Sequence, residues 1–205
     1  MYYGERFNSI THAVGACLAA AGGTVLVTVA ARGGDPWKIT SFSIYAAMLL
    51  VLYLTSSLYH AVRGMAKDVL RKIDHCAIYL LIGGTYTPFA LVTLRGAWGW
   101  SMFGVVWSLA LLGISQELLY AKGRRVLSIV IYMMMGWLAV IAIQPLLAAL
   151  GWEGFAWLAA GGMLYTGGIA FYATDHKVRH GHGIWHLFVL GGSICHYVAV
   201  LFYVA

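Results

Sequence analysis

Long apolar runs, separated by short polar segments, dominate this sequence of 205 residues. A helix needs about 20 consecutive apolar residues to cross the hydrocarbon core of a bilayer, which is about 30 Å thick. Seven runs meet this requirement, and we predict membrane-spanning helices over residues 11–31, 39–60, 74–94, 98–120, 126–143, 154–173 and 183–204. The sequence therefore predicts an all-α integral membrane protein, a seven-transmembrane helix bundle in which residues 1–205 form a single domain.

The composition excludes the soluble classes of protein. Hydrophobic residues make up 61% of the chain and charged residues only 10%, whereas soluble domains average about 25% charged residues. The formal net charge of +6 does not indicate nucleic-acid binding, because the basic residues lie in short gaps between apolar runs rather than on one folded face. We expect membrane lipids and no nucleic acid as partners, and the composition is neutral about oligomeric state.

The basic residues predict how the bundle is oriented, because lysine and arginine accumulate in the cytoplasmic loops of membrane proteins. Ten of the 13 basic residues share a side with the N-terminus: Arg6, Arg63, Lys67, Arg71, Lys72, Lys122, Arg124, Arg125, Lys177 and Arg179. The opposite side carries only Arg32, Lys38 and Arg95. We therefore expect a cytoplasmic N-terminus and an external C-terminus.

Polar residues that are rare at membrane depth converge at the predicted cytoplasmic side. Ser56 and His60 are four residues apart at the end of the second run, and Asp74 opens the third. His182 and His186 are again four apart, at the start of the seventh run. Residues four apart share a helix face, so the predicted topology brings these five side chains to one level. Ionisable residues at membrane depth are costly and indicate a functional site.

Three histidines and a carboxylate suit zinc, which in catalytic sites commonly has three protein ligands and an open position for water. We predict His60, His182 and His186 as metal ligands. Asp74 would take a proton from the activated water, and Ser56 would orient a ligand or stabilise an oxyanion. The HxxxH pair alone is a weak signal, because two histidines one turn apart also line polar cavities or cap helices.

Other polar residues have simpler interpretations. Glu5 and His12 are placed to reach the same cavity, although a carboxylate is also favourable at a helix N-terminus. His180 lies close enough to His182 to replace it as a ligand, and His196, about 15 Å further along the last helix, is expected to be a hydrogen-bonded interior residue. Glu117 is expected to face the cytoplasmic interface at the end of the fourth helix.

Several motifs resemble the hemolysin III family, the bacterial branch of the progestin and adipoQ receptor superfamily. They are the Ser56-xxx-His60 pair, the His182-xxx-His186 pair, and the sequences at 5–12 (ERFNSITH) and 74–88 (DHCAIYLLIGGTYTP). The resemblance implies seven transmembrane helices with a cytoplasmic N-terminus. It also implies zinc on His60, His182 and His186, and an aspartate, Asp74, that contacts zinc-bound water, as in the related eukaryotic receptors.

Two functions follow from these observations. The first is a zinc-dependent hydrolase of a lipid amide or ester, ceramidase-like, in the inner (plasma) membrane of a bacterium, as the link between the related receptors and amide hydrolysis implies. The alternative is a non-enzymatic protein that alters membrane permeability or senses membrane state, since the family name implies cytolysis. Zinc-independent leakage of liposomes would favour the second.

Overall fold

The computed structural model describes residues 4–120 and 126–205, and every regular element in these ranges is helical. The elements are α1 (Arg6–Gly33), α2 (Pro36–Ala61), α3 (Met65–Pro88), η1 (Phe89–Thr93), α4 (Ala97–Leu119), α5 (Val126–Trp137), η2 (Leu138–Ala142), α6 (Ile143–Ala173) and α7 (Gly181–Tyr203). Within the described ranges, six helical stretches are long and apolar enough to cross a membrane. The prediction of an all-α membrane protein is confirmed, whereas the prediction of seven membrane crossings stays a prediction.

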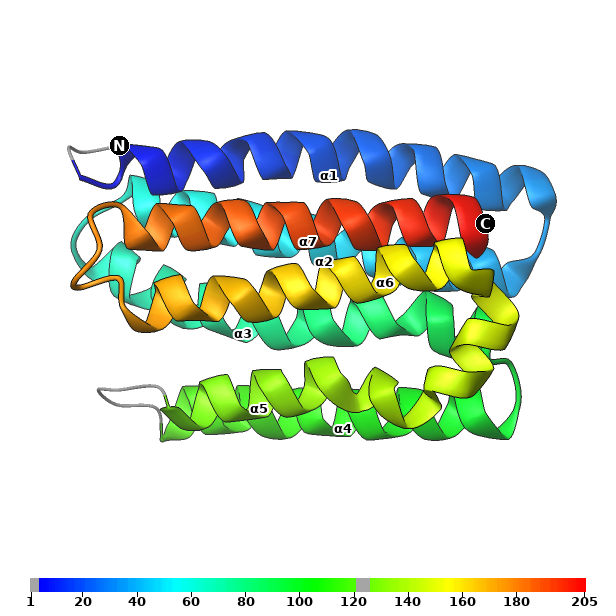
Figure 1. Cartoon of the computed structure of the whole chain (residues 1–205). Helices are drawn as coiled ribbons and strands as arrows, with labels where there is room; N and C mark the ends of the chain where they lie inside the picture. Colours follow the sequence, from blue (N-terminus) through cyan, green and yellow to red (C-terminus); the bar gives the residue numbers. More distant parts are fainter. Residues whose placement is uncertain (1–3, 121–125) are drawn as a thin grey trace.

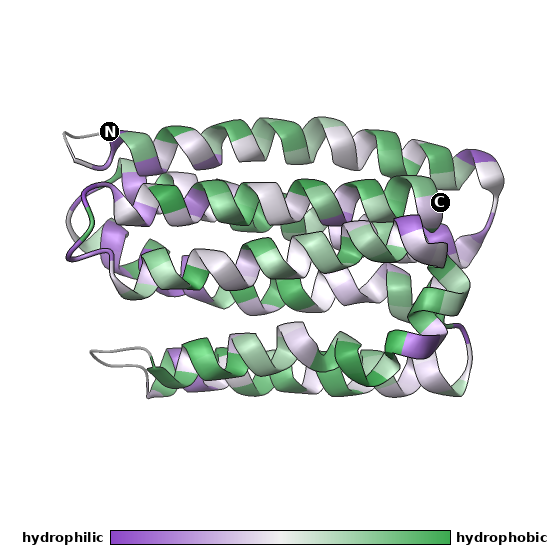
Figure 2. Cartoon of the chain, viewed as in Figure 1, coloured by the Kyte–Doolittle hydropathy of each residue, from purple (hydrophilic) through white to green (hydrophobic). Residues whose placement is uncertain are grey.

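The helices lie side by side in one bundle, with the described N-terminal residues at one end and the C-terminus at the other (Figure 1). Hydrophilic residues concentrate toward the two ends of the bundle and in the connections, while the middle of most helices is hydrophobic (Figure 2). Figure 1 also shows α4 and α5 running together along one side, and α6 running beside α7. The two polar ends of the bundle are therefore the places where water can reach a functional site.

The stretch Val126–Ala173 is 48 residues long and counts as one of the six candidate spans. It contains two interruptions, the 3₁₀ turn η2 and Gly151, whose φ of 67° lies in the left-handed region that favours glycine. Figure 1 shows that α5 and the longer part of α6 run in opposite directions on either side of these interruptions. The backbone break thus falls at Gly151, between the runs predicted over 126–143 and 154–173.

The turn between α1 and α2 follows from local sequence. Gly34 ends α1 with a φ of 70°, and its N–H donates to the carbonyl groups of Ala30 and Ala31. Asp35 then caps α2 by accepting a hydrogen bond from the Trp37 N–H, and Pro36 occupies the first helical position, where the missing N–H costs nothing. A left-handed glycine followed by Asp-Pro is a compact helix-to-helix connection.

The expected start of the third helix at Asp74 is wrong. The helix α3 begins at Met65, so Asp74 lies well inside it, and Lys67 and Arg71, assigned to a loop, are helical. Hydropathy detects the part of a helix that contacts hydrocarbon, whereas an amphipathic end continues into the polar interface without an apolar signal. The predicted loop residues Lys122, Arg124 and Arg125 lie outside the described residues.

Candidate metal centre

Three histidines meet where the end of α2 approaches the start of α7. One ring nitrogen from each of His60, His182 and His186 lies within 4.8 Å of the others. His60 and His186 are 2% and 0% exposed, respectively, and His182 is half-buried. The four-residue spacing on α7 places its two rings on one face, and α2 supplies the third ring. These are the three histidines predicted as ligands, and the structure brings them together.

The two buried histidines each use Nδ1 for a hydrogen bond to an acceptor from the N-terminal segment. Nδ1 of His60 lies 2.6 Å from Oε2 of Glu5, and Nδ1 of His186 lies 3.1 Å from the backbone oxygen of Asn8. A neutral imidazole that donates from Nδ1 presents a lone pair on Nε2. Neither Nε2 atom has a hydrogen-bond partner among the described residues. Two buried acceptor atoms are therefore available for a metal.

The third histidine follows the same pattern closer to the surface. Nδ1 of His182 lies 3.2 Å from Oδ2 of Asp175, in the connection before α7. Histidines that bind a metal almost always donate their other ring N–H to a carboxylate or a backbone carbonyl, which fixes the tautomer and raises ligand basicity. All three histidines of the cluster meet this condition. The donor set of three neutral imidazoles suits zinc.

The carboxylate of Glu5 joins α1, α2 and α3 around the site. Besides contacting His60, Glu5 accepts hydrogen bonds from Nζ of Lys67 at 2.8 Å and from Nδ2 of Asn8 at 2.8 Å. Burial alone would raise the pKa of Glu5, but the hydrogen bonds with His60, Lys67 and Asn8 outweigh it and hold the pKa well below its ordinary value. Glu5 is therefore a carboxylate at neutral pH. Lys67 was not expected at the site because the residue was assigned to a loop.

His12 is a fourth histidine beside the cluster. Its ring stacks on that of His186, with centroids 3.6 Å apart and an interplanar angle of 15°, and the edge of Tyr53 packs against it at 5.0 Å. His12 is 2% exposed, and neither ring nitrogen has a hydrogen-bond partner in the described part of the chain. The expectation that Glu5 and His12 reach the region of the site agrees with these contacts.

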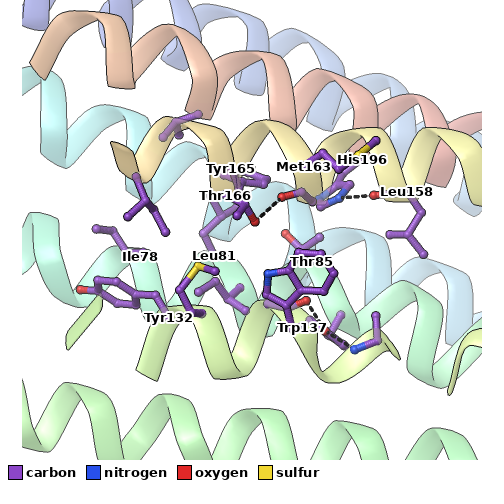
Figure 3. A pocket seen from close by; sticks show the side chains of 18 of the residues that line it. Ile78, Leu81, Thr85, Tyr132, Trp137, Leu158, Met163, Tyr165, Thr166 and His196 are labelled. Carbon is purple, nitrogen blue, oxygen red and sulfur yellow. Dashed lines mark hydrogen bonds between the residues drawn. The ribbon is translucent and has the colours of Figure 1, made fainter. Parts of the chain in front are cut away.

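An elongated cavity of about 440 Å³ starts beside the histidine cluster. His12, Ser56 and Asp74 line the end beside the histidine cluster. Mostly apolar side chains, among them Ile78 and Leu81, line the remainder (Figure 3). This volume lies in the range of about 300–1,000 Å³ that is typical of small-molecule pockets. Asp74 and Ser56 are both buried. The two predicted non-ligand residues thus occupy the cavity wall, one from α3 and one from α2.

One face of α3 forms a wall of the cavity from end to end. The lining residues are Asp74, Ile78, Leu81, Ile82, Thr85 and Tyr86 of α3 and Phe89, the first residue of η1. They recur at the three- and four-residue spacing of a helix face. From the first to the last of them, the helical backbone rises roughly 22 Å at 1.5 Å per residue. The cavity therefore extends along this helix, with His12, Ser56 and Asp74 at the histidine end and further polar side chains, among them Thr85 and His196, along its wall.

Glu117 differs from its expected position at the membrane interface. It is 2% exposed, its Oε2 accepts a hydrogen bond from Ser128 at 3.0 Å, and its Oε1 lies 3.4 Å from Nδ1 of His75. Tyr132 donates to the His75 backbone oxygen at 2.9 Å. The expectation was wrong because α5 and α3 cover this face of α4, a packing that the local sequence does not reveal.

The remaining histidines are separate from the cluster. His180 is exposed, has a left-handed φ of 60° and packs against Phe7 at a ring distance of 6.1 Å. The group of mutually close ligand atoms contains His182 and not His180. His196 is buried and its Nε2 lies 3.1 Å from the backbone oxygen of Leu158, in agreement with its expected role as a hydrogen-bonded interior residue.

Proteins similar to this chain are known from bacteria and animals. The family described as haemolysin-III related matches residues 2–197. A hemolysin-3 homolog of Bacillus subtilis (strain 168) is 46% identical over 200 residues, which cover 97% of this chain and 93% of that protein. Hemolysin-3 of Bacillus cereus is 42% identical over 201 residues, with coverages of 98% and 91%. The human monocyte to macrophage differentiation factor is 28% identical over 205 residues, with coverages of 97% and 83%.

Proposed function

The chain belongs to the haemolysin-III-related family, and from this premise we propose that it is a zinc-dependent hydrolase of a lipid amide or ester in a bacterial plasma membrane. The observation that carries the proposal is the cluster of His60, His182 and His186, whose ligand atoms lie within 4.8 Å of one another. Each of the three directs Nδ1 to an acceptor. This arrangement orients Nε2 atoms for a metal.

The proposal includes seven membrane crossings. The stretch Val126–Ala173 of 48 residues is far longer than the roughly 20 residues that one crossing needs, and α5 and α6 run in opposite directions in Figure 1. Two crossings in this stretch make seven in total and put the termini on opposite sides. The excess of lysine and arginine on the side of the N-terminus favours a cytoplasmic N-terminus, and the histidine cluster then faces the cytoplasm.

The three histidines are the residues that would hold the metal. Zinc bound by three imidazoles lowers the pKa of water towards about 7 and so supplies a nucleophile at neutral pH. The carboxylate of Glu5 and the backbone oxygen of Asn8 hold the rings of His60 and His186 in place.

Asp74 is the residue that we assign to proton transfer, from its burial and its place in the cavity wall. The oxygen of the attacking water bonds to the substrate carbonyl carbon, and the bond from that carbon to the amine or alcohol breaks. The Asp74 carboxylate takes the proton from the water and returns it to the leaving nitrogen or oxygen. Ser56 lines the same end of the cavity, where its hydroxyl donates a hydrogen bond to the carbonyl oxygen as negative charge develops there.

The cavity fits a lipid chain. Its lining is largely apolar and extends from Asp74 of α3 to Phe89 of η1. Three of its lining residues on α5, η2 and α6, namely Trp137, Val140 and Met163, are 49%, 50% and 63% exposed, so the cavity reaches the lipid-facing side of the bundle. An acyl chain can therefore enter from the bilayer while its carbonyl group meets the polar end.

Zinc binding is tested first, by metal analysis of the purified protein and of His60→Ala, His182→Ala and His186→Ala. Each variant should lose most of the zinc, since two protein ligands hold the ion poorly. His176→Ala is the matched control, because His176 is an exposed histidine in the connection before α7, and its zinc content should equal that of the unmodified protein. Full zinc occupancy in all three cluster variants would refute the site.

Hydrolysis requires its own measurement, the release of fatty acid from a panel of lipid amides and esters by the zinc-loaded protein. Asp74→Asn should retain zinc and lose at least about a hundredfold in rate, the usual contribution of a positioned acid or base. The name hemolysin belongs to the Bacillus relatives, so leakage of dye from liposomes is measured in parallel. Leakage that persists in zinc-free protein, with no hydrolysis of any lipid, would favour the permeability function instead.

A further inference from the structure

A second cavity, of about 340 Å³, lies beside the connection from α6 to α7. This connection is at the same end of the bundle as the described N-terminal residues (Figure 1). The cavity, which we call the mouth pocket, is lined by Gly4, Asn8, Asp175, His176, His180, Gly181 and His182. Three of these residues carry imidazoles and one carries a carboxylate, which are groups that bind zinc. Asp175, His176 and His180 are exposed, so an ion in water reaches them.

Consecutive turns fold the connection back onto the start of α7. The N–H of Val178 donates to the Thr174 backbone oxygen at 3.1 Å, and the N–H of Gly181 donates to the Val178 backbone oxygen at 2.9 Å. A β-carbon on Gly181 would lie 3.0 Å from Cα of Asp175, so a glycine permits this close approach. Oδ2 of Asp175 lies 3.2 Å from Nδ1 of His182. The turns thus place a carboxylate of the mouth pocket against a histidine of the cluster.

His182 belongs both to the mouth pocket and to the histidine cluster. Its side chain is 24% exposed, whereas that of His60 is 3% exposed and His186 is completely buried. The Asp175 carboxylate that pairs with Nδ1 of His182 is itself exposed. The cluster is therefore most accessible from water at His182, through the mouth pocket.

The other approaches to the cluster suit a cation poorly. The start of α1 packs against the start of α7, where a β-carbon on Gly183 would collide with the Phe7 ring and meet Oδ1 of Asn8. The larger cavity reaches the lipid-facing side of the bundle, and its lining is largely apolar. Moving a charge into an apolar environment is costly. A hydrated cation is therefore expected to arrive through the mouth pocket.

The mouth pocket does not hold its ligands in a closed geometry. Among the described residues, the group of mutually close ligand atoms contains neither His176 nor His180. An ion in the mouth pocket keeps part of its water shell and is held by few protein groups, so it is bound weakly and released readily. Sites along a pathway for ions need this property, because a tightly held ion does not move on.

We propose that Asp175, His176 and His180 form a loading site for a divalent transition-metal cation on its way to the histidine cluster. The inference rests on the proposed function, because it assumes that the cluster binds zinc. His176 and His180 replace part of the water shell of the ion with imidazole nitrogen, and Asp175 offsets its charge. His182, which lines the mouth pocket, is then the first of the three cluster histidines to bind the ion.

The test is the rate at which the zinc bound to the purified protein in lipid nanodiscs exchanges with a zinc isotope in solution. The double variant with His176→Ala and His180→Ala should exchange about tenfold more slowly, because the loading site raises the local concentration of the ion beside His182. Its zinc Kd, from competition with a chelator, should be unchanged, since a residue on the pathway affects binding and release equally. A change in rate at constant Kd separates a pathway residue from a ligand.

Two further variants exclude a mere distortion of the connection. Thr174→Val is the matched control, because Thr174 is an exposed residue of the same connection whose hydroxyl donates to the Ala170 backbone oxygen at 2.7 Å, and it should exchange zinc at the unmodified rate. The double variant with His176→Glu and His180→Glu replaces the imidazoles by carboxylates, which also bind zinc, and should restore fast exchange. Distortion of the connection would not be corrected in this way.

A measurement on the unmodified protein decides the proposal even if the double alanine variant fails to fold. When the cluster is already filled with zinc, added Co²⁺ should broaden the ring NMR signals of His176 and His180. The ring signals of His196, which is buried and lies ten residues beyond the cluster on α7, should stay sharp. Paramagnetic broadening confined to the two exposed histidines would place a weakly held cation in the mouth pocket.

The outcomes separate this inference from the proposed function. Unchanged exchange in the double alanine variant, or the absence of broadening at His176 and His180, overturns the loading site and leaves the zinc site standing. A higher zinc Kd in that variant also overturns it, because the two histidines would then be ligands of the bound ion. Unmodified protein that binds no zinc overturns the proposed function and this inference together. Slower exchange at constant Kd, restored by the two glutamates, supports the loading site.

Discussion

Oε2 of Glu5 lies 2.6 Å from Nδ1 of His60, across 55 residues of sequence. The contact joins the segment before α1 to the last turn of α2, and Lys67 of α3 holds the other carboxylate oxygen at 2.8 Å. A carboxylate in this position orients the histidine and raises its basicity without touching the metal. Glu5 is thus a positioning residue for the proposed zinc site.

Glu5→Gln should weaken zinc binding about 10- to 100-fold without eliminating it, the usual effect of removing such a carboxylate. The measurement is the zinc Kd by competition with a chelator. Asp68→Asn is the control, because the Asp68 carboxylate is on the same side of the bundle but is exposed and contacts only Arg71 among the ion pairs found in the described residues. A Glu5→Gln protein with the zinc Kd of the unmodified protein would show that Glu5 does not orient His60.

His12 provides a second prediction, because its ring stacks on His186 at 3.6 Å. His12→Ala should leave a void beside His186, a proposed zinc ligand, and destabilise the protein by about 2–3 kcal/mol. This corresponds to a decrease in Tm of roughly 5–10 °C. His12→Phe preserves a stacked ring and should retain most of the stability and the zinc. Thermal unfolding in detergent, with zinc analysis of each variant, checks both. Similar Tm values for the two variants would mean that ring stacking does not support the site.

The histidine cluster could be predicted because it depends only on the spacing of residues along a helix and on the topology of the predicted spans. His182 and His186 share a helix face through their spacing, and His60 ends an apolar run on the same predicted side, so depth and direction follow from topology. The partner of Nδ1 of His60 depends instead on how α1 and α2 are rotated against each other, and that of His186 depends on how α1 packs against α7. The Glu5–His60 contact therefore emerges only from the folded structure.

The parts of the fold that escaped prediction have a common physical cause. Hydropathy responds to the hydrocarbon layer, so it set the start of the third helix at Asp74 although α3 begins at Met65. It also suggested an interfacial position for Glu117, which α3 and α5 in fact cover. The burial of a polar residue near the end of a helix depends on its neighbouring helices, which lie far away in sequence.

Two glycines of α4 allow a matched test of close packing. A β-carbon on Gly113 would collide with the Tyr79 ring, whereas one on Gly104 would meet nothing within 4 Å. Gly113→Ala should therefore destabilise the protein by about 1–3 kcal/mol, the cost of overpacking. Gly104→Ala should be neutral or stabilise it by up to about 1 kcal/mol through helix propensity. The comparison is by thermal unfolding in one detergent, and equal stabilities of the two variants would contradict the packing of α4 on α3.

Two serines on α4 and α5 test the buried polar contact between these helices. Ser128 donates to Glu117, a carboxylate that is 2% exposed, at 3.0 Å. Ser128→Ala should cost about 1–3 kcal/mol, because it removes a hydrogen-bond donor from a buried charged or polar group. Ser115→Ala is the control, since Ser115 is exposed and donates to the Leu111 backbone oxygen of its own helix. The free energy of unfolding of this variant should change by no more than about 0.5 kcal/mol. Unfolding free energies of the two variants that agree within error would show that the Ser128–Glu117 contact does not hold α5 against α4.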